Sequence, residues 1–134
     1  MEQNIWEYDD FIFKGDELKG MTQKGKDKVK LEGKTDLVIP ELTPDGLPLK
    51  KIGDNAFYRR GLTSVVIPNT VESIGYDAFG VCKLKEVKLP EALVNIEGFA
   101  FYRNKLTKVE FGSKVKRLEP SSFAMNELTE ITFP

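Results

Sequence analysis

The 134-residue sequence contains no histidine and a single cysteine, Cys82. Without histidine, neither a Ser-His-Asp nor a Cys-His catalytic arrangement can form, and a zinc site lacks most of its usual ligands. One cysteine excludes a disulfide within the chain, and because free cysteines are commonly buried we interpret Cys82 as a structural thiol. The glutamates occur at variable offsets, which is typical of solvated faces rather than of a paired acid and base. The sequence therefore predicts a protein that is not an enzyme and needs no cofactor.

Charge of one sign and long hydrophobic runs are also missing. The 20 basic and 21 acidic residues leave a net charge of −1, which provides no field to attract nucleic acid. No apolar run approaches the roughly 18 to 20 residues that a membrane span requires, and Met1-Glu2-Gln3-Asn4 lacks the composition of a signal peptide. A content of 40% hydrophobic and 31% charged residues fits one folded domain.

What the sequence does contain is a 22-residue phrase in four copies, which begin at Ile52, Ile74, Ile96 and Leu118. The copies reduce to the pattern I-G-x-x-A-F-x-x-x-x-L-x-x-V-x-I-P-x-x-V. A fixed period near 20 residues is the signature of stacked structural units, each of which cannot bury its hydrophobic face alone. The sequence therefore predicts a solenoid.

The L-x-x-V-x-I-P part of each copy alternates apolar and polar residues, which indicates a half-buried strand that the proline ends. An upstream segment, 37–40, matches it and supplies a first strand. We expect five neighbouring parallel strands, with their first and third residues pointing inward: Leu37 and Ile39, Val65 and Ile67, Val87 and Leu89, Val109 and Phe111, Ile131 and Phe133. A second short extended piece follows each strand, and the A-F pair is expected on a helical or 3₁₀ turn, with the phenylalanines stacked in one column.

The first 36 residues differ from the repeats and predict a cap. Aromatic residues alternate from Trp6 to Phe13, residues 14–17 form a turn and a return strand begins at Leu18, which indicates a hairpin. Thr22 can cap the N-terminus of a helix over residues 23–31, with Met21, Gly25 and Val29 spaced four apart on the buried side. Residues 28–31 also alternate as a strand would, which is the alternative. Residues 20–27 nearly match a phosphate-binding loop, but aspartate stands where the hydroxyl is required, so no nucleotide is expected. The lysines of this region are expected in a solvated surface, with binding of an anionic partner as the alternative: Lys24, Lys26, Lys28, Lys30 and Lys34.

The repeat phrase resembles the BspA-type, or Treponema-type, leucine-rich repeat, with position, residue identity and period in agreement over residues 52–134. Cys82, Asn104 and Asn126 occupy the column in which such repeats place Asn or Cys to satisfy loop backbone groups, and Arg60 departs from it. The resemblance implies a β-rich α/β fold: a right-handed leucine-rich-repeat solenoid with a parallel sheet, short helical turns and an N-terminal hairpin-helix cap. It also implies a bacterial protein that is exposed on the cell surface or secreted and takes part in adhesion.

Two groups of residues are candidates for a protein- or glycan-binding surface. Outward strand positions carry Lys88, Lys108 and Glu110, in columns whose charges cancel. Residues of the types that anchor interfaces recur in the turn column: Tyr58, Arg59, Tyr76, Phe99, Tyr102 and Arg103. We expect a non-catalytic binding module, and the alternatives are a structural spacer or accessory domain and, far behind, an enzyme.

The organisation expected is one compact unit with a cap over residues 1–36 and a solenoid of about five coils over residues 37–134. The sequence stops directly after Ile131 and Phe133, which are expected to face inward, and shows no second cap. Solenoids need both ends covered. This predicts further repeats or another domain after Pro134, or self-association through the uncapped end.

Overall fold

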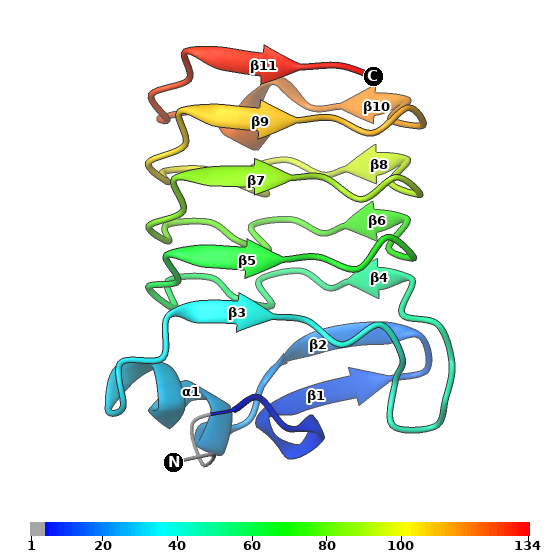
Figure 1. The fold of residues 1–134 in the computed structure, drawn as a ribbon, viewed down its shortest axis with the longest axis vertical. Coiled ribbons are helices and arrows are strands. Elements are labelled where there is room, and N and C mark those ends of the chain that lie inside the picture. The colour runs from blue at the N-terminus through cyan, green and yellow to red at the C-terminus, as the bar shows by residue number, and fades with distance from the viewer. Residues whose placement is uncertain (1–4) are drawn as a thin grey trace.

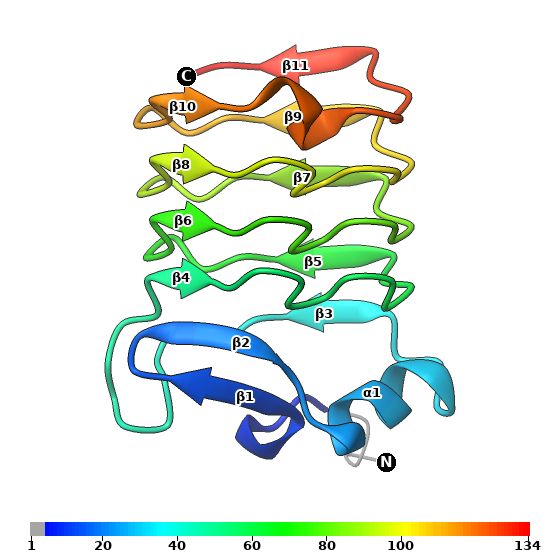
Figure 2. The same ribbon diagram turned by 180° about the vertical axis from the view of Figure 1, so that it is seen from behind.

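The computed structural model describes residues 5–134, so Met1 to Asn4, whose composition argued against a signal peptide, lie outside the described residues. The chain forms a β-rich solenoid that stands on a small cap (Figure 1). Its front face carries β3 (Asp36–Val38), β5 (Ser64–Val66), β7 (Glu86–Lys88), β9 (Lys108–Glu110) and β11 (Glu130–Thr132). Its back face carries β4 (Lys51–Ile52), β6 (Ser73–Ile74), β8 (Asn95–Ile96) and β10 (Arg117–Leu118), as Figure 2 shows.

The cap has the predicted hairpin and helix. Strands β1 (Phe11–Lys14) and β2 (Glu17–Met21) pair antiparallel, and β2 then pairs parallel with β4, so that the hairpin extends the back sheet to six strands. Helix α1 (Gln23–Lys30) starts after Thr22, whose hydroxyl accepts a hydrogen bond from the Gly25 N–H at 3.2 Å. Trp6 and Tyr8 lie outside the strand, because a 3₁₀ helix, η1 (Tyr8–Asp10), precedes it.

The predicted phenylalanine column is confirmed. Phe57, Phe79, Phe101 and Phe123 stack with ring centroids 5.3 Å apart at each step and with nearly parallel planes. The first three rings are fully buried, and the apolar residues of the strands surround them. The A-F pairs lie in non-helical turns in the first three copies, and only the last copy has the expected 3₁₀ helix, η2 (Pro120–Phe123).

The front sheet departs from the prediction in one place. We expected five paired strands, but among the residues that the structure describes β3 pairs only with β5, while β7, β9 and β11 form a separate sheet. The hydrogen bond from the Ile39 N–H to the Val66 carbonyl recurs as Leu89 to Glu110 and as Phe111 to Thr132. Its equivalent from Ile67 to Lys88 is missing in this part of the chain, as is the bond from Lys85 to Thr63.

The break coincides with a lysine in the column of residues that directly precede the front strands, which holds threonine at positions 63, 107 and 129 and lysine at position 85. Thr63, Thr107 and Thr129 each donate their hydroxyl to a carbonyl of the coil before, which belongs to Thr35, Lys85 and Thr107, at 3.3 to 3.4 Å. Position 85 is a lysine, whose ammonium donates no such bond to the Thr63 carbonyl. The lysine therefore removes one link between coils at the place where the strands part.

This break predicts a local difference in amide exchange. The N–H groups of Ile67 and Lys85 have no ladder partner, while the equivalent groups of Leu89 and Thr107 are bonded to the next and the preceding coil. We expect the amides of Ile67 and Lys85 to exchange with solvent on the order of 100-fold faster than those of Leu89 and Thr107. Residue-resolved hydrogen exchange measures this directly, and equal protection at the four sites would contradict the break.

The last described coil continues the inward columns. Ile131 is the register partner of the buried Val109, and the Phe133 ring stacks on that of Phe111, although the two side chains are 50% and 69% exposed. Together with Phe111, Leu118 and Phe123 they surround a hollow of about 280 Å³. The end of the stack is thus an open apolar surface.

Candidate binding surfaces

The structure separates the predicted binding residues into two surfaces. Lys88, Lys108 and Glu110 lie on the front sheet, on β7 and β9. The six aromatic and arginine residues lie in the turns that follow the back strands, and we call them the turn ridge: Tyr58, Arg59, Tyr76, Phe99, Tyr102 and Arg103. One ligand therefore cannot be assumed to touch both sets, and each surface has to be considered separately.

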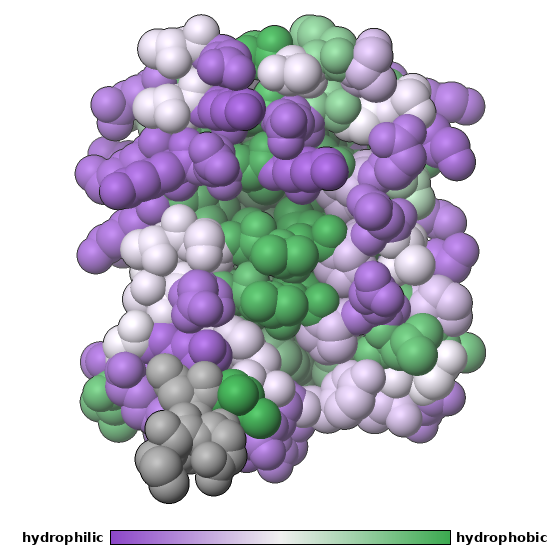
Figure 3. All heavy atoms as spheres, viewed as in Figure 1, coloured by the Kyte–Doolittle hydropathy of each residue, from purple (hydrophilic) through white to green (hydrophobic). Residues whose placement is uncertain are grey.

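On the front face, hydrophobic side chains occupy the middle and hydrophilic ones the band above it (Figure 3). Val38 and Val66 are register partners on β3 and β5, and they are 50% and 59% exposed. At the break between β5 and β7 lies a groove of about 180 Å³, which Val65 and the charged residues of β7 and β9 line. Lys88, Lys108 and Glu110 thus border a real depression of this face.

Most of the charged side chains around this groove form no ion pair with another described residue. Lys108 lies 3.8 Å from Glu130, and this is the one contact within 4 Å between oppositely charged groups that involves β7, β9 or β11 in the described residues. Glu86, Lys88 and Glu110 keep their charges free for a partner.

The turn ridge consists of two groups of packed rings and guanidinium groups. The rings of Tyr76 and Phe99 have centroids 5.6 Å apart, and Phe99 meets Tyr102 edge to face at 5.1 Å. The guanidinium of Arg103 lies over the Tyr102 ring at 6.0 Å, and Arg59 lies over Tyr58 at 5.4 Å. The structure therefore brings the members of the two predicted Tyr-Arg pairs together, one pair on each of two coils.

Tight turns hold this ridge in place. Arg59, Phe99 and Arg103 have φ angles between 56° and 59°, a left-handed conformation that non-glycine residues adopt only when the surroundings enforce it. The Tyr76 ring lies against Gly98, where a Cβ atom would come within 3.1 Å of the ring. Backbone and rings are thus preorganised, and part of the aromatic surface is used for packing between coils.

The column of Cys82, Asn104 and Asn126 acts as predicted. The Asn104 amide donates to the carbonyls of Phe79 and Phe101, and its oxygen accepts from the Leu84 N–H at 3.0 Å. The Cys82 thiol is buried and donates to the Phe57 carbonyl at 3.2 Å, and burial raises the pKa of this thiol. The column satisfies backbone groups of the coils.

Two features of the cap were not predicted, and one of them corrects the expectation that all five lysines are solvated. Lys28 is 3% exposed, and its ammonium donates to the Asp10 carboxylate at 2.6 Å and to the Ile5 carbonyl at 2.5 Å. Burial opposes the charge of Lys28, but the hydrogen bonds and charges of Asp10 and Glu7 together outweigh it, so the pKa of Lys28 is raised. Lysine spacing alone could not reveal this, because the partner is 18 residues away.

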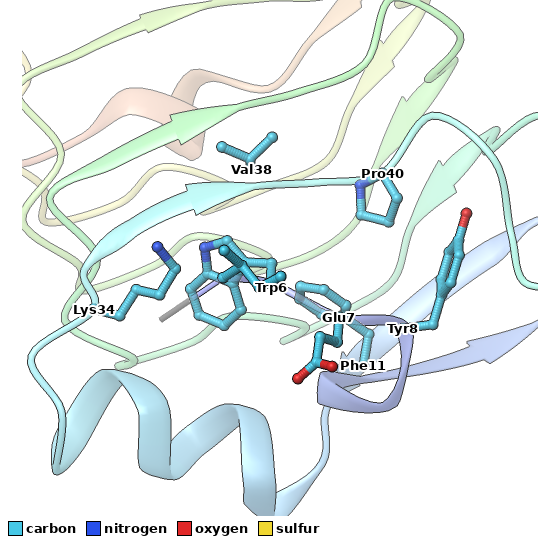
Figure 4. A pocket seen from close by; sticks show the side chains of 8 residues that line it. Trp6, Glu7, Tyr8, Phe11, Lys34, Val38 and Pro40 are labelled. Carbon is cyan, nitrogen blue, oxygen red and sulfur yellow. The ribbon is translucent and has the colours of Figure 1, made fainter. Parts of the chain in front are cut away.

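The second feature is a pocket of about 510 Å³ between the cap and β3. Figure 4 shows the side chains of Trp6, Phe11, Val38 and Pro40 around it. The indole N–H of Trp6 donates to the Asp36 carbonyl at 2.8 Å. Because this N–H is already hydrogen-bonded, the Trp6 side of the pocket offers a mainly apolar surface. Alternating aromatics in the sequence were the only signal of it.

Neither a metal-binding cluster nor a membrane-spanning helix is found within residues 5–134. No group of three or more acidic or cysteine side chains could hold a metal ion there. No helix in the same range is long and apolar enough to cross a membrane.

The sequence and the fold were compared with those of known proteins. Residues 50–134 match the family described as BspA type Leucine rich repeat region, in six copies. No curated protein matches the sequence. A leucine-rich repeat protein from Bacteroides capillosus is similar in structure, with a TM-score of 0.69 and 28% identity over 88% of this chain and 86% of that one. A leucine rich cell surface protein from Faecalibacterium prausnitzii aligns with a TM-score of 0.40 and 21% identity, and covers 92% of this chain but 52% of its own. Because the family match covers more than half of the sequence, this chain belongs to the BspA-type leucine-rich repeat family.

Proposed function

We propose that this chain is a non-catalytic module of a bacterial surface or secreted protein, which binds a protein or glycan through the turn ridge. The observation that carries the proposal is the set of preorganised Tyr and Arg side chains, of which the tyrosines Tyr58 and Tyr102 are half-buried. Tyr76 is 48% exposed, and Arg59 and Arg103 are exposed as well. Tyrosine and arginine dominate the energetically important positions of interfaces.

Preorganisation supports this choice of surface. A partner that binds mobile side chains pays about 0.5 to 1.5 kcal/mol for each one that it immobilises. Here the rings already contact one another, and the guanidinium of Arg103 already lies over the Tyr102 ring. Less entropy is lost on binding, so a small ridge can give useful affinity. The surface or secreted location rests on the family resemblance alone.

A binding screen with a double variant tests this function. A panel of matrix proteins and glycans identifies the partner, and Tyr102→Ala/Arg103→Ala is then expected to weaken it about tenfold or more, as the loss of a hot-spot pair does. The double variant removes one edge-to-face ring contact, so we expect the unfolding free energy to fall by no more than about 1.5 kcal/mol. Binding by surface plasmon resonance and denaturant unfolding measure the two effects.

The matched control is Ile12→Ala/Lys14→Ala, which removes one exposed apolar and one basic side chain from β1 of the cap. This pair should bind like the unmodified protein. If both double variants bind with unchanged affinity, the turn ridge is not the site.

The alternative of a spacer or accessory domain has one observation in its favour. The Tyr58 and Tyr76 rings rest on Gly80 and Gly98 of the following coil, so the ridge also contributes to stacking. A screen in which no protein or glycan binds would favour the spacer.

A further inference from the structure

The front face carries a checkerboard of charge around the groove. On β7, Glu86 and Lys88 point outward, and on β9 their register partners are Lys108 and Glu110. Each charge therefore has an opposite charge beside it along the strand and another across to the neighbouring strand. Since the four charges sum to zero, a ligand with charges of one sign gains nothing from this pattern.

A checkerboard of this kind is complementary to itself. If a second copy is turned by 180° about an axis parallel to the solenoid axis and laid face to face, the two outward columns exchange places. Glu86 then faces the partner's Lys88, and Lys108 faces the partner's Glu110. Isologous interfaces need this property, because the same patch must fit itself.

We propose that the front face binds the front face of a second copy of this chain, with the two solenoids side by side. This goes beyond the proposed function, because it uses a different surface from the turn ridge. The occupant follows from charge complementarity: all four charges of the checkerboard meet an opposite charge, and none meets a like one.

The other rows of the face bring no like charges together in this arrangement. The exchange of columns sets Asp36 opposite the partner's Val38, Ser64 opposite the partner's Val66, and Glu130 opposite the partner's Thr132. The exposed Val66 becomes covered, which adds an apolar contribution of about 25 cal/mol for each Å² that is buried. Val38 meets a carboxylate and adds no such contribution.

Contacts within one chain do not explain the pattern equally well. If the checkerboard served only to pair charges between neighbouring strands, Glu86 would contact Lys108 and Lys88 would contact Glu110. Neither pair is within 4 Å, and Lys108 instead lies nearest to Glu130. Opposite charges therefore lie in neighbouring register positions on β7 and β9, but they form no ion pairs between these two strands.

The size of the face indicates a weak dimer. A standard interface buries about 800 Å² on each partner, roughly a tenth of the 7437 Å² of this chain. Five short strands offer a face at the lower end of this range, where weak and reversible association is typical, and we expect a dissociation constant on the order of 10 to 100 µM. Because exposed charges contribute to it, raising the ionic strength should weaken it.

Charge exchange tests the dimer. By sedimentation equilibrium at low salt, the unmodified chain should dimerise, whereas Lys88→Glu and Glu86→Lys should each weaken self-association about tenfold or more, because each sets like charges opposite one another twice. An equimolar mixture of the two variants should dimerise again, since one copy then presents carboxylates at positions 86 and 88 and the other presents ammonium groups. Lys51→Glu, the same charge change on the exposed side of β4, is the control and should leave the dimer unchanged.

Recovery in the mixture separates an interface from a loss of stability, since a destabilised fold would not recover on mixing. A chain that remains monomeric at about 0.5 mM, or variants whose mixture remains monomeric, would overturn the proposal. Tyr102→Ala/Arg103→Ala should dimerise normally, so the dimer and the function of the turn ridge can fail independently.

Discussion

Replacing Lys28 by methionine is expected to lower the free energy of unfolding by about 3 to 5 kcal/mol, as the removal of one partner of a buried ion pair does. The Asp10 side chain is fully buried, and its Oδ2 atom accepts from both the Lys28 ammonium and the Glu7 N–H. Without the ammonium, this carboxylate stays in the core with no opposite charge. Urea unfolding of the variant at neutral pH measures the loss.

Two comparisons make this expectation specific. Lys24→Met removes an exposed lysine of the same helix, and surface ion pairs contribute about 1 kcal/mol at most, so this variant should lose little. Asp10→Asn combined with Lys28→Met removes both charges and should regain part of the stability. A single variant that is as stable as Lys24→Met would show that the buried pair is energetically unimportant.

The pH dependence of this contribution follows from the direction of the pKa shift. The pKa of Lys28 is raised above the ordinary value of 10.5 in the folded protein. A raised pKa contributes stability that is fully present below the unfolded value and is lost as the pH rises through the folded one. The stabilisation is therefore complete at neutral pH and is lost only in strongly alkaline solution.

Phe101→Ala is expected to cost about 3 to 5 kcal/mol, which is the range for large-to-small changes of buried aromatic residues. The ring is fully buried between Phe79 and Phe123, with centroids 5.3 Å away on both sides. Removing it opens a cavity in the middle of the stack and separates the last coil from the others. Denaturant unfolding followed by circular dichroism measures the effect.

The chain offers a matched control at the open end. Phe133 also stacks on a neighbouring ring, that of Phe111 at 5.2 Å, but it is 69% exposed. Phe133→Ala should therefore cost less than about 1 kcal/mol. A loss at Phe101 that is as small as the loss at Phe133 would mean that the column does not hold the coils together.

The sequence predicted the repeated part of the fold well, because the same constraints act in every copy. Burial of Phe79 and Phe101 and the backbone contacts of Asn104 recur with the 22-residue period, so four copies of one pattern fix them. The cap is not repeated. Its buried Lys28 depends on Asp10, which sequence spacing does not connect to the helix.

The break in the front sheet shows another limit of prediction from pattern. The inward residues of β5 and β7 fit the repeat as well as those of the paired strands, and the pattern therefore predicted continuous pairing. The difference lies in one exposed column, where Lys85 replaces the threonine whose hydroxyl contacts the preceding coil. Such positions are treated as variable when repeats are aligned, although here the residue type accompanies a change in hydrogen bonding.

The candidate binding residues were predicted as one set, but they lie on two faces. The repeat gives the position of each residue within a coil but not the face on which it lies; Lys88 is exposed on the front sheet and Tyr102 is half-buried in the turn ridge. Which faces of the coil these positions occupy depends on how tightly the chain turns after the back strands. Phe99 and Arg103 form that turn in the left-handed backbone conformation. Neither position is a glycine, so the sequence does not indicate this conformation.

The break also has a mechanical consequence for the molecule. At the level where β5 and β7 part, β6 and β8 remain paired on the back, and the Lys83 N–H still donates to the Leu62 carbonyl at 2.8 Å. A rod that is hydrogen-bonded on one side and open on the other bends most easily toward the bonded side, because the open side can widen. The solenoid is therefore stiff above and below this level and has a compliant joint between its second and third front strands. In a repeat protein under shear, the position of a single lysine in a column of threonines would set where the array flexes.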